Sequence, residues 1–151
     1  MGVFWVKMMK KYKVGYTQGV FDMFHIGHLN ILKRAKEQCE VLIVGVNADN
    51  LVRIYKDKTP VIDEESRRTI VENIKAVDKA IIVHSLDKVE LMKQLHFDAV
   101  FIGDDWKNSE RWNVTEKELE GHNVPVIYLP HTPNISSTEL MEEEPNRVKG
   151  E

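Results

Sequence analysis

The stretch Gly19–His28, GVFDMFHIGH, decides how the rest of the chain is interpreted. It follows a short apolar-alternating run at residues 14–16 that predicts a first strand, and it leads into a helical apolar pattern over residues 29–39. A strand, a glycine-containing turn and a helix start are therefore compressed into one short stretch. His25 and His28 stand three positions apart at the helix start. Such a turn, with free backbone N–H groups and the positive end of a helix dipole, suits a polyphosphate.

Length and composition restrict the class of protein. The chain has 151 residues, of which 42% are hydrophobic and 30% charged, and a formal net charge of -3. This length fits one domain with one core. The negative charge argues against non-specific binding to nucleic acid, which needs a clustered positive face. No apolar run approaches a membrane span, and a single cysteine, Cys39, excludes an internal disulfide and favours a reducing cytoplasm.

Strand and helix patterns alternate along the chain, and several strands are continuous apolar runs typical of strands covered on both faces. The expected strands are 14–16, 41–46, 79–84, 99–102 and 124–129. The expected helices are 29–39, 63–76 with Asp63 as its cap, 87–95 and one that opens at Ser136, with 107–122 helical or mixed. The polar segment 47–60 is expected to be a loop.

Repeated strand–helix–strand units with right-handed crossovers predict an α/β fold with a doubly wound, mostly parallel five-stranded sheet. The expected domain covers residues 13–141, between an N-terminal extension at 1–12 and a charged, disordered tail at 142–151. In such sheets ligands bind beyond the carboxyl ends of the strands. The motifs that suit this chemistry follow the five predicted strands, so we expect them to meet at that edge. They are His25 and His28, Lys56 and Lys58, Lys88, residues 104–106 and residues 131–138.

The motif GVFDMFHIGH resembles the H-x-G-H signature of the nucleotidyltransferase superfamily, and residues 13–140 resemble the glycerol-3-phosphate cytidylyltransferase family. The resemblance implies a Rossmann-like nucleotidyltransferase fold and a homodimer. It also implies transfer of CMP from CTP to a small phosphoalcohol, with glycerol 3-phosphate giving CDP-glycerol for a cell-surface polymer, and release of pyrophosphate. Because the sequence shows no carboxylate cage, we expect Mg²⁺ to be held through the CTP phosphates and water.

Nucleotidyl transfer needs alignment and charge neutralisation more than covalent chemistry. We therefore expect His25, His28, Lys56 and Lys58 to be catalytic, with the imidazoles donating to the α-phosphate and the lysines closing over the phosphates. The simpler interpretation is that the histidines are hydrogen-bonded for structural reasons and that Lys56-Asp57-Lys58 is a solvated loop.

The resemblance also assigns binding residues. For the nucleotide they are Gly19, Val20, Phe21, Asp22, Gly27, Arg67, Lys75, Asp105, Thr132, Ile135, Ser136, Ser137 and Thr138. For the phosphoalcohol they are Lys58, Lys88 and His131. Asp105 is expected to accept a hydrogen bond from the amino group of cytosine, although an aspartate at a strand end also commonly caps a turn. Ser136 is equally suited to a helix N-cap.

Some positions depart from the family pattern. Lys75 and His131 stand where the relatives have arginine, Ala76 where they have tyrosine, and Asn134 where they have glycine. His131 and Asn134 leave the phosphoalcohol open, whereas Lys75 bears on CTP affinity or dimer contacts. Two other functions also stay open at this point. One is an adenylyltransferase acting on FMN or pantetheine phosphate, although the arginine expected after residues 135–138 is absent. The other is a non-catalytic nucleotide-binding module, against which the retained histidines and lysines argue.

Overall fold

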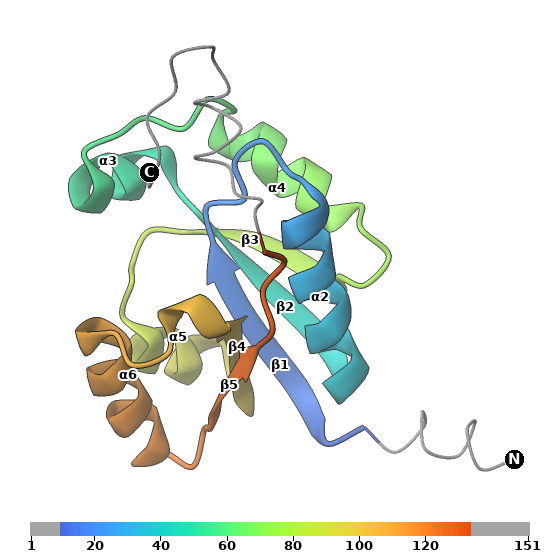
Figure 1. Cartoon of the computed structure of the whole chain (residues 1–151), viewed down its shortest axis with the longest axis vertical. Coiled ribbons are helices and arrows are strands. Elements are labelled where there is room, and N and C mark those ends of the chain that lie inside the picture. The colour runs from blue at the N-terminus through green and yellow to red at the C-terminus, as the bar shows by residue number, and fades with distance from the viewer. Residues whose placement is uncertain (1–9, 134–151) are drawn as a thin grey trace, which may run out of the picture.

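The computed structural model describes residues 10–133 (Figure 1). The strands are β1 (Tyr12–Gly19), β2 (Cys39–Asn47), β3 (Lys79–Val83), β4 (Ala99–Gly103) and β5 (Val126–Leu129). The helices are α2 (Ile26–Gln38), α3 (Asp49–Lys56), α4 (Glu64–Glu72), α5 (Lys88–Leu95) and α6 (Glu110–Glu120), with a 3₁₀ turn η1 (Asp104–Trp106). None of the helices in this part of the chain is both long and apolar enough to span a bilayer.

The five strands form one sheet in the order β3-β2-β1-β4-β5, and every pairing is parallel. This confirms the expected doubly wound fold. From β1 the chain adds strands in one direction through β2 to β3, then crosses back to add β4 and β5 on the other side. The winding therefore reverses between β1 and β4, where open α/β sheets bind their ligands.

Helices cover both faces of the sheet, with α2 and α4 on one and α5 and α6 on the other (Figure 1). Successive residues of a strand enter opposite cores. In β4, Phe101 packs with the α2 and α4 side, whereas Val100 and Ile102 pack with the α5 and α6 side. Two buried faces explain why the strands appear as unbroken apolar runs.

The expectation of a loop over residues 47–60 is wrong, because Asp49–Lys56 forms α3. Leu51, Val52 and Tyr55 give this helix an amphipathic pattern that the sequence analysis missed, although only Val52 is buried. Asp57 ends the helix in the left-handed conformation, with φ of 54°. A short helix of this kind depends on tertiary contacts for its stability, and α3 receives them through Asp49, which pairs with Arg67.

Several boundaries also differ from the expected ones. The helix capped by Asp63 ends at Glu72, not at residue 76. β1 begins at Tyr12, which pairs with Cys39, so the fold starts inside the predicted N-terminal extension. β5 begins at Val126, after a proline that cannot donate to the sheet. The helix expected from Ser136 and the tail at 142–151 lie outside the described residues.

Candidate active site

A cavity of about 480 Å³ opens beyond the carboxyl ends of β1 and β4. Most of the residues predicted for the site line it, namely Gly19, Val20, Phe21, Asp22, His25, Gly27, His28, Lys56, Lys58, Lys88, Asp105, His131 and Thr132. Arg67 and Lys75 do not line it. Ile135, Ser136, Ser137 and Thr138 lie outside the described residues. The structure thus brings residues from five separate chain segments to the switch point of the sheet.

The turn from β1 to α2 forms the base of the cavity. Phe21 and Met23 adopt left-handed backbone conformations, with φ of 54° and 48°, which non-glycine residues enter at some cost. Asp22 is buried, and its carboxylate accepts hydrogen bonds of 2.8 and 3.0 Å from the backbone N–H groups of Val61 and Ile62. Asp22 therefore ties the segment after Lys58 to the turn that carries the histidines.

His25 and His28 together cap the start of α2. The backbone N–H of Gly27 donates to Nδ1 of His25 at 3.0 Å, and the backbone N–H of His25 donates to Nδ1 of His28 at 3.2 Å. The two rings stack with centroids 3.9 Å apart. This is the arrangement of a capping box, with imidazoles in place of the usual serine and glutamate. The structure thus confirms that the pair is hydrogen-bonded for structural reasons, and its catalytic role stays a prediction.

His28 is held neutral by its surroundings. Burial, reinforced by the nearby His25, lowers its pKa to about 3, and the rings of Phe21 and Phe24 lie 5.5 and 5.3 Å away. A neutral imidazole that accepts at Nδ1 carries its proton at Nε2. His28 is therefore a neutral N–H donor at the cavity wall.

Cations surround the rest of the cavity. Partial burial, together with the charges of Lys58 and Arg111, lowers the pKa of Lys56. Lys88 is more deeply placed, with 6% of its surface exposed, and burial followed by the charge of Arg111 lowers its pKa to about 8. Buried ammonium groups without a carboxylate partner are uncommon unless they serve a ligand.

The sequence analysis missed Arg111 and Trp112, which both line the cavity from the first turn of α6. They carry no motif and lie in the segment 107–122 for which no clear pattern was found. Their place in the chain was the one available indication. A helix that begins soon after the carboxyl end of β4 can direct its first side chains to the same rim of the cavity as Asp105.

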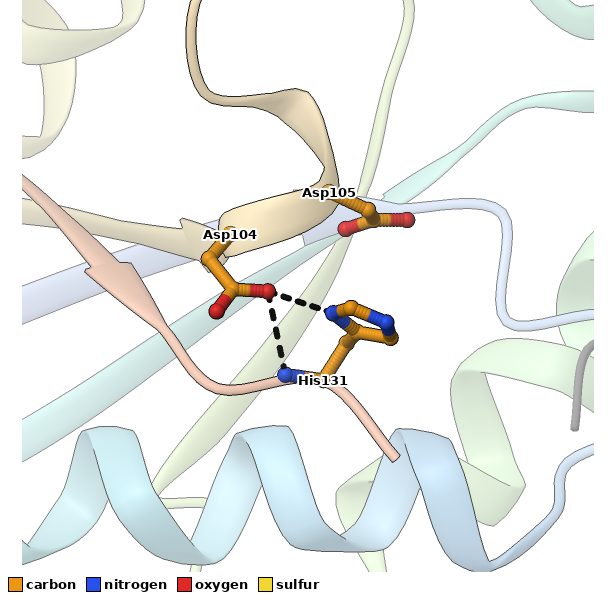
Figure 2. Close-up of side chains that lie close together, drawn as sticks. All are labelled: Asp104, Asp105 and His131. Atoms are coloured by element: carbon orange, nitrogen blue, oxygen red, sulfur yellow. Dashed lines mark hydrogen bonds and ion pairs between the residues drawn. The ribbon is translucent and has the colours of Figure 1, made fainter. Parts of the chain in front are cut away.

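Asp104, Asp105 and His131 form a polar cluster where β4 and β5 end (Figure 2). Nδ1 of His131 contacts Asp104, and its backbone N–H donates to the same carboxylate at 3.3 Å. The hydrogen bond raises the pKa of His131 and lowers that of Asp104. Asp104 thus anchors His131, while Asp105 lines the cavity and its contact with cytosine stays a prediction.

The same cluster is the one set of three potential metal ligands found within residues 10–133, with ligand atoms within 4.8 Å of one another. Magnesium prefers oxygen ligands in octahedral geometry and usually takes one or two carboxylates together with substrate phosphates. Because Asp104 is already engaged by His131, this set does not fit a protein cage for magnesium.

Arg67 lies fully buried behind the cavity wall instead of lining it. Its guanidinium donates to the carbonyl oxygens of Val20, Asn47 and Ile62 at 2.8 Å each, and it pairs with Asp49. Val20 follows β1, Asn47 is the last residue of β2, and Ile62 follows α3. Arg67 therefore fixes the segments that carry the binding residues, and the structure does not bear out direct nucleotide contact.

Lys75 is exposed in the turn between α4 and β3. Because α4 runs antiparallel to the strands, this turn lies at their amino ends, opposite the cavity. The structure thus separates Lys75 from every other predicted site residue that it describes. A sequence pattern cannot show this, since it gives no indication of which sheet edge a helix end reaches.

Replacing Arg67 with methionine is expected to lower the free energy of unfolding by about 3 kcal/mol, since three buried carbonyls and Asp49 lose their partner. Urea denaturation measures the change. The matched control is Arg68→Met, because the Arg68 ion pairs to Glu65 and Glu72 lie on the surface of α4 and contribute little. Equal stability of the two variants would contradict the structural role of Arg67.

The parallel, doubly wound sheet and its cavity at the β1–β4 switch define a Rossmann-like fold of the nucleotidyltransferase type. The family model described as cytidylyltransferase-like matches residues 16–143. The chain therefore belongs to the cytidylyltransferase-like family.

Individual relatives agree with this assignment. The glycerol-3-phosphate cytidylyltransferase of Bacillus spizizenii is 35% identical over 125 residues, covering 82% of this chain and 91% of that protein. The bifunctional protein HldE of Helicobacter pylori is 32% identical over 70% of this chain but only 23% of its own length. A lipopolysaccharide core biosynthesis protein from Thermoplasma volcanium superposes with a TM-score of 0.66 at 28% identity, covering 80% and 97% of the two chains. Pantothenate synthetase from Thermus thermophilus shares the fold at a TM-score of 0.64 and 15% identity, covering 95% of this chain and 66% of that one.

Proposed function

We propose that the protein transfers CMP from CTP to a small phosphoalcohol, with glycerol 3-phosphate as the first candidate, and releases pyrophosphate. The observation that carries this proposal is the gathering of the histidine pair and the three lysines Lys56, Lys58 and Lys88 around one cavity. The similarity to the Bacillus spizizenii enzyme over most of both chains supports the choice of CTP and of glycerol 3-phosphate.

The reaction assigns a task to each side of the cavity. An oxygen of the acceptor phosphate attacks the α-phosphorus of CTP while the bond to pyrophosphate breaks. Little covalent work falls to the protein, so positioning and charge neutralisation dominate. The Nε2–H groups of His25 and His28 would donate to phosphate oxygens as their charge increases. Lys56 and Lys58, on the segment held by Asp22, would neutralise the departing pyrophosphate.

Recognition of the cytosine base and binding of a metal ion complete the proposal. Asp105, at the cavity rim, offers an acceptor for the amino group that cytosine has and uracil lacks. Magnesium would enter with the triphosphate and be bound mainly by phosphate oxygens and water, where it offsets negative charge. Ser136, Ser137 and Thr138 keep their proposed role at the β- and γ-phosphates.

A matrix of nucleotides and acceptors tests the function. The protein with Mg²⁺ is incubated with CTP or ATP and with glycerol 3-phosphate, ethanolamine phosphate, choline phosphate, FMN or pantetheine phosphate, and products are followed by ³¹P NMR. We expect one CDP-alcohol and equimolar pyrophosphate, with CTP preferred over ATP by at least about 100-fold. Adenylyl products would identify the adenylyltransferase alternative, and nucleotide binding without any product would indicate a binding module.

A further inference from the structure

Three residues that carry hydrogen-bond donors line the cavity on the side of the sheet covered by α5 and α6. They are Lys88 with its ammonium, Arg111 with its guanidinium and Trp112 with its indole N–H. Nζ of Lys88 lies 5.3 Å from the centroid of the Trp112 ring, and the guanidinium of Arg111 lies 5.3 Å from the ring of Trp106. The charge of Arg111 acts on both Lys88 and Lys56, which places the cations close together.

Most of the N–H groups of these donors have no acceptor within residues 10–133. The indole Nε1 of Trp112 is buried and has no hydrogen-bond partner there, a state that proteins seldom leave uncompensated. Lys88 donates one hydrogen bond, to the carbonyl oxygen of Leu86 at 3.0 Å, and two of its N–H groups remain. Neither Lys88 nor Arg111 forms an ion pair in this part of the chain. Because the set offers donors alone, its complement is an oxygen-rich anion.

The position of the set indicates which anion. His25, His28 and the β1–α2 turn approach the cavity from the α2 side, while Lys88, Arg111 and Trp112 approach from the α5 and α6 side. Nucleotidyl transfer must bring two phosphate groups together, and the cavity has donors on both flanks to accept one each. A phosphomonoester carries a charge of roughly -1.5 to -2 at neutral pH on three oxygens, which matches two cations and one neutral donor.

We propose that Arg111 and Trp112 extend the phosphoalcohol site already predicted at Lys88, and that the three residues together bind the phosphate group of the acceptor. Arg111 and Trp112 then determine the preference for a phosphomonoester over the unphosphorylated alcohol. The inference rests on the proposed function for its reaction. A terminal oxygen of the bound phosphomonoester forms a bond to the α-phosphorus of CTP, the bond from that phosphorus to the β-phosphate oxygen breaks, and pyrophosphate leaves with the electron pair. The dianion attacks directly, so no proton is transferred.

Steady-state kinetics of Arg111→Ala and Trp112→Phe test this site. We expect the KM for glycerol 3-phosphate, or for the acceptor that the matrix identifies, to rise about 30-fold in Arg111→Ala and about tenfold in Trp112→Phe. The KM for CTP is expected to stay within twofold of the wild-type value. Arg53→Ala is the matched control, because Arg53 is an exposed arginine of α3 outside the cavity lining. A rise in the KM for CTP instead, or no change in either constant, would overturn the inference.

A binding measurement separates this inference from the proposed function. Isothermal titration calorimetry with glycerol 3-phosphate, and with glycerol as the uncharged probe, needs no turnover. Wild-type binding of the phosphomonoester alone, weakened in Arg111→Ala and in Trp112→Phe, supports the site even if CTP yields no product. CTP turnover with unweakened acceptor binding in both variants would reject the site and leave the function intact. Thermal melting of Trp112→Phe checks that the α6 core is preserved.

Discussion

Replacing His28 with alanine is expected to lower kcat by about 10²- to 10³-fold, the loss typical of one donor that stabilises transition-state charge. The reason is the protonation state that the site imposes. Burial keeps the ring neutral, with a pKa of about 3, and Nδ1 accepts from the backbone of His25. The proton therefore stays at Nε2 across the physiological range, and a fixed dipole needs no reorganisation during transfer.

His28→Gln separates catalysis from the helix cap. Glutamine is a natural capping-box residue at this position, so its side-chain oxygen can still accept from the His25 backbone. We expect His28→Ala to lose rate in single-turnover assays and about 1 kcal/mol of stability with the cap, whereas His28→Gln keeps the cap and an amide N–H donor and loses less rate. A fully active His28→Ala would show that the ring serves the cap alone.

The pH dependence follows from the same ring. Because its pKa is lower in the folded chain than the unfolded value of about 6.5, the unfolded chain binds this proton more tightly. The stability that His28 contributes is therefore present above pH 6.5 and is lost as the pH falls toward 3. Consequently, the wild-type rate should show no acidic limb from His28 between pH 5 and 7.

The sequence predicted the sheet and the edge that carries the site because both depend on local patterns. Strands buried on two faces are apolar throughout, as Val100 and Phe101 illustrate by entering opposite cores. Parallel connections then fix the carboxyl edge as the place where His25, Lys88 and Asp105 meet. Neither inference needs knowledge of long-range packing.

The roles of individual charged residues could not be predicted in this way. Arg67 and Arg68 are neighbours in α4 with the same side chain, yet one is fully buried against three carbonyls and the other forms surface ion pairs. Which of the two arginines is buried depends on which face of α4 packs against the sheet and on where the distant segments with the carbonyls run. Likewise the neutrality of His28 depends on Phe21 and Phe24, and the position of Arg111 depends on how α6 docks.

Replacing Lys88 with methionine is expected to stabilise the fold while lowering kcat/KM for the acceptor by about 100-fold or more. The ammonium is buried, and Arg111 opposes its charge more than Asp87 favours it, so its pKa falls to about 8. Holding it charged at pH 7 therefore costs the folded state on the order of 3 kcal/mol, which methionine removes. Such a conflict between stability and activity is expected of a residue kept for its ligand.

The pH dependence of the stability gained in Lys88→Met provides the sharper measurement. Between about pH 8 and the unfolded pKa near 10.5, the unfolded chain binds more protons, so the wild-type protein becomes more stable as the pH rises. The advantage of Lys88→Met in urea denaturation should thus be largest at pH 7 and shrink toward pH 10. Lys33→Met on the exposed surface of α2 is the matched control and should show no such trend. If Lys88→Met is no more stable than this control at pH 7, or uses the acceptor as well as the wild type, Lys88 is not a strained, ligand-binding cation.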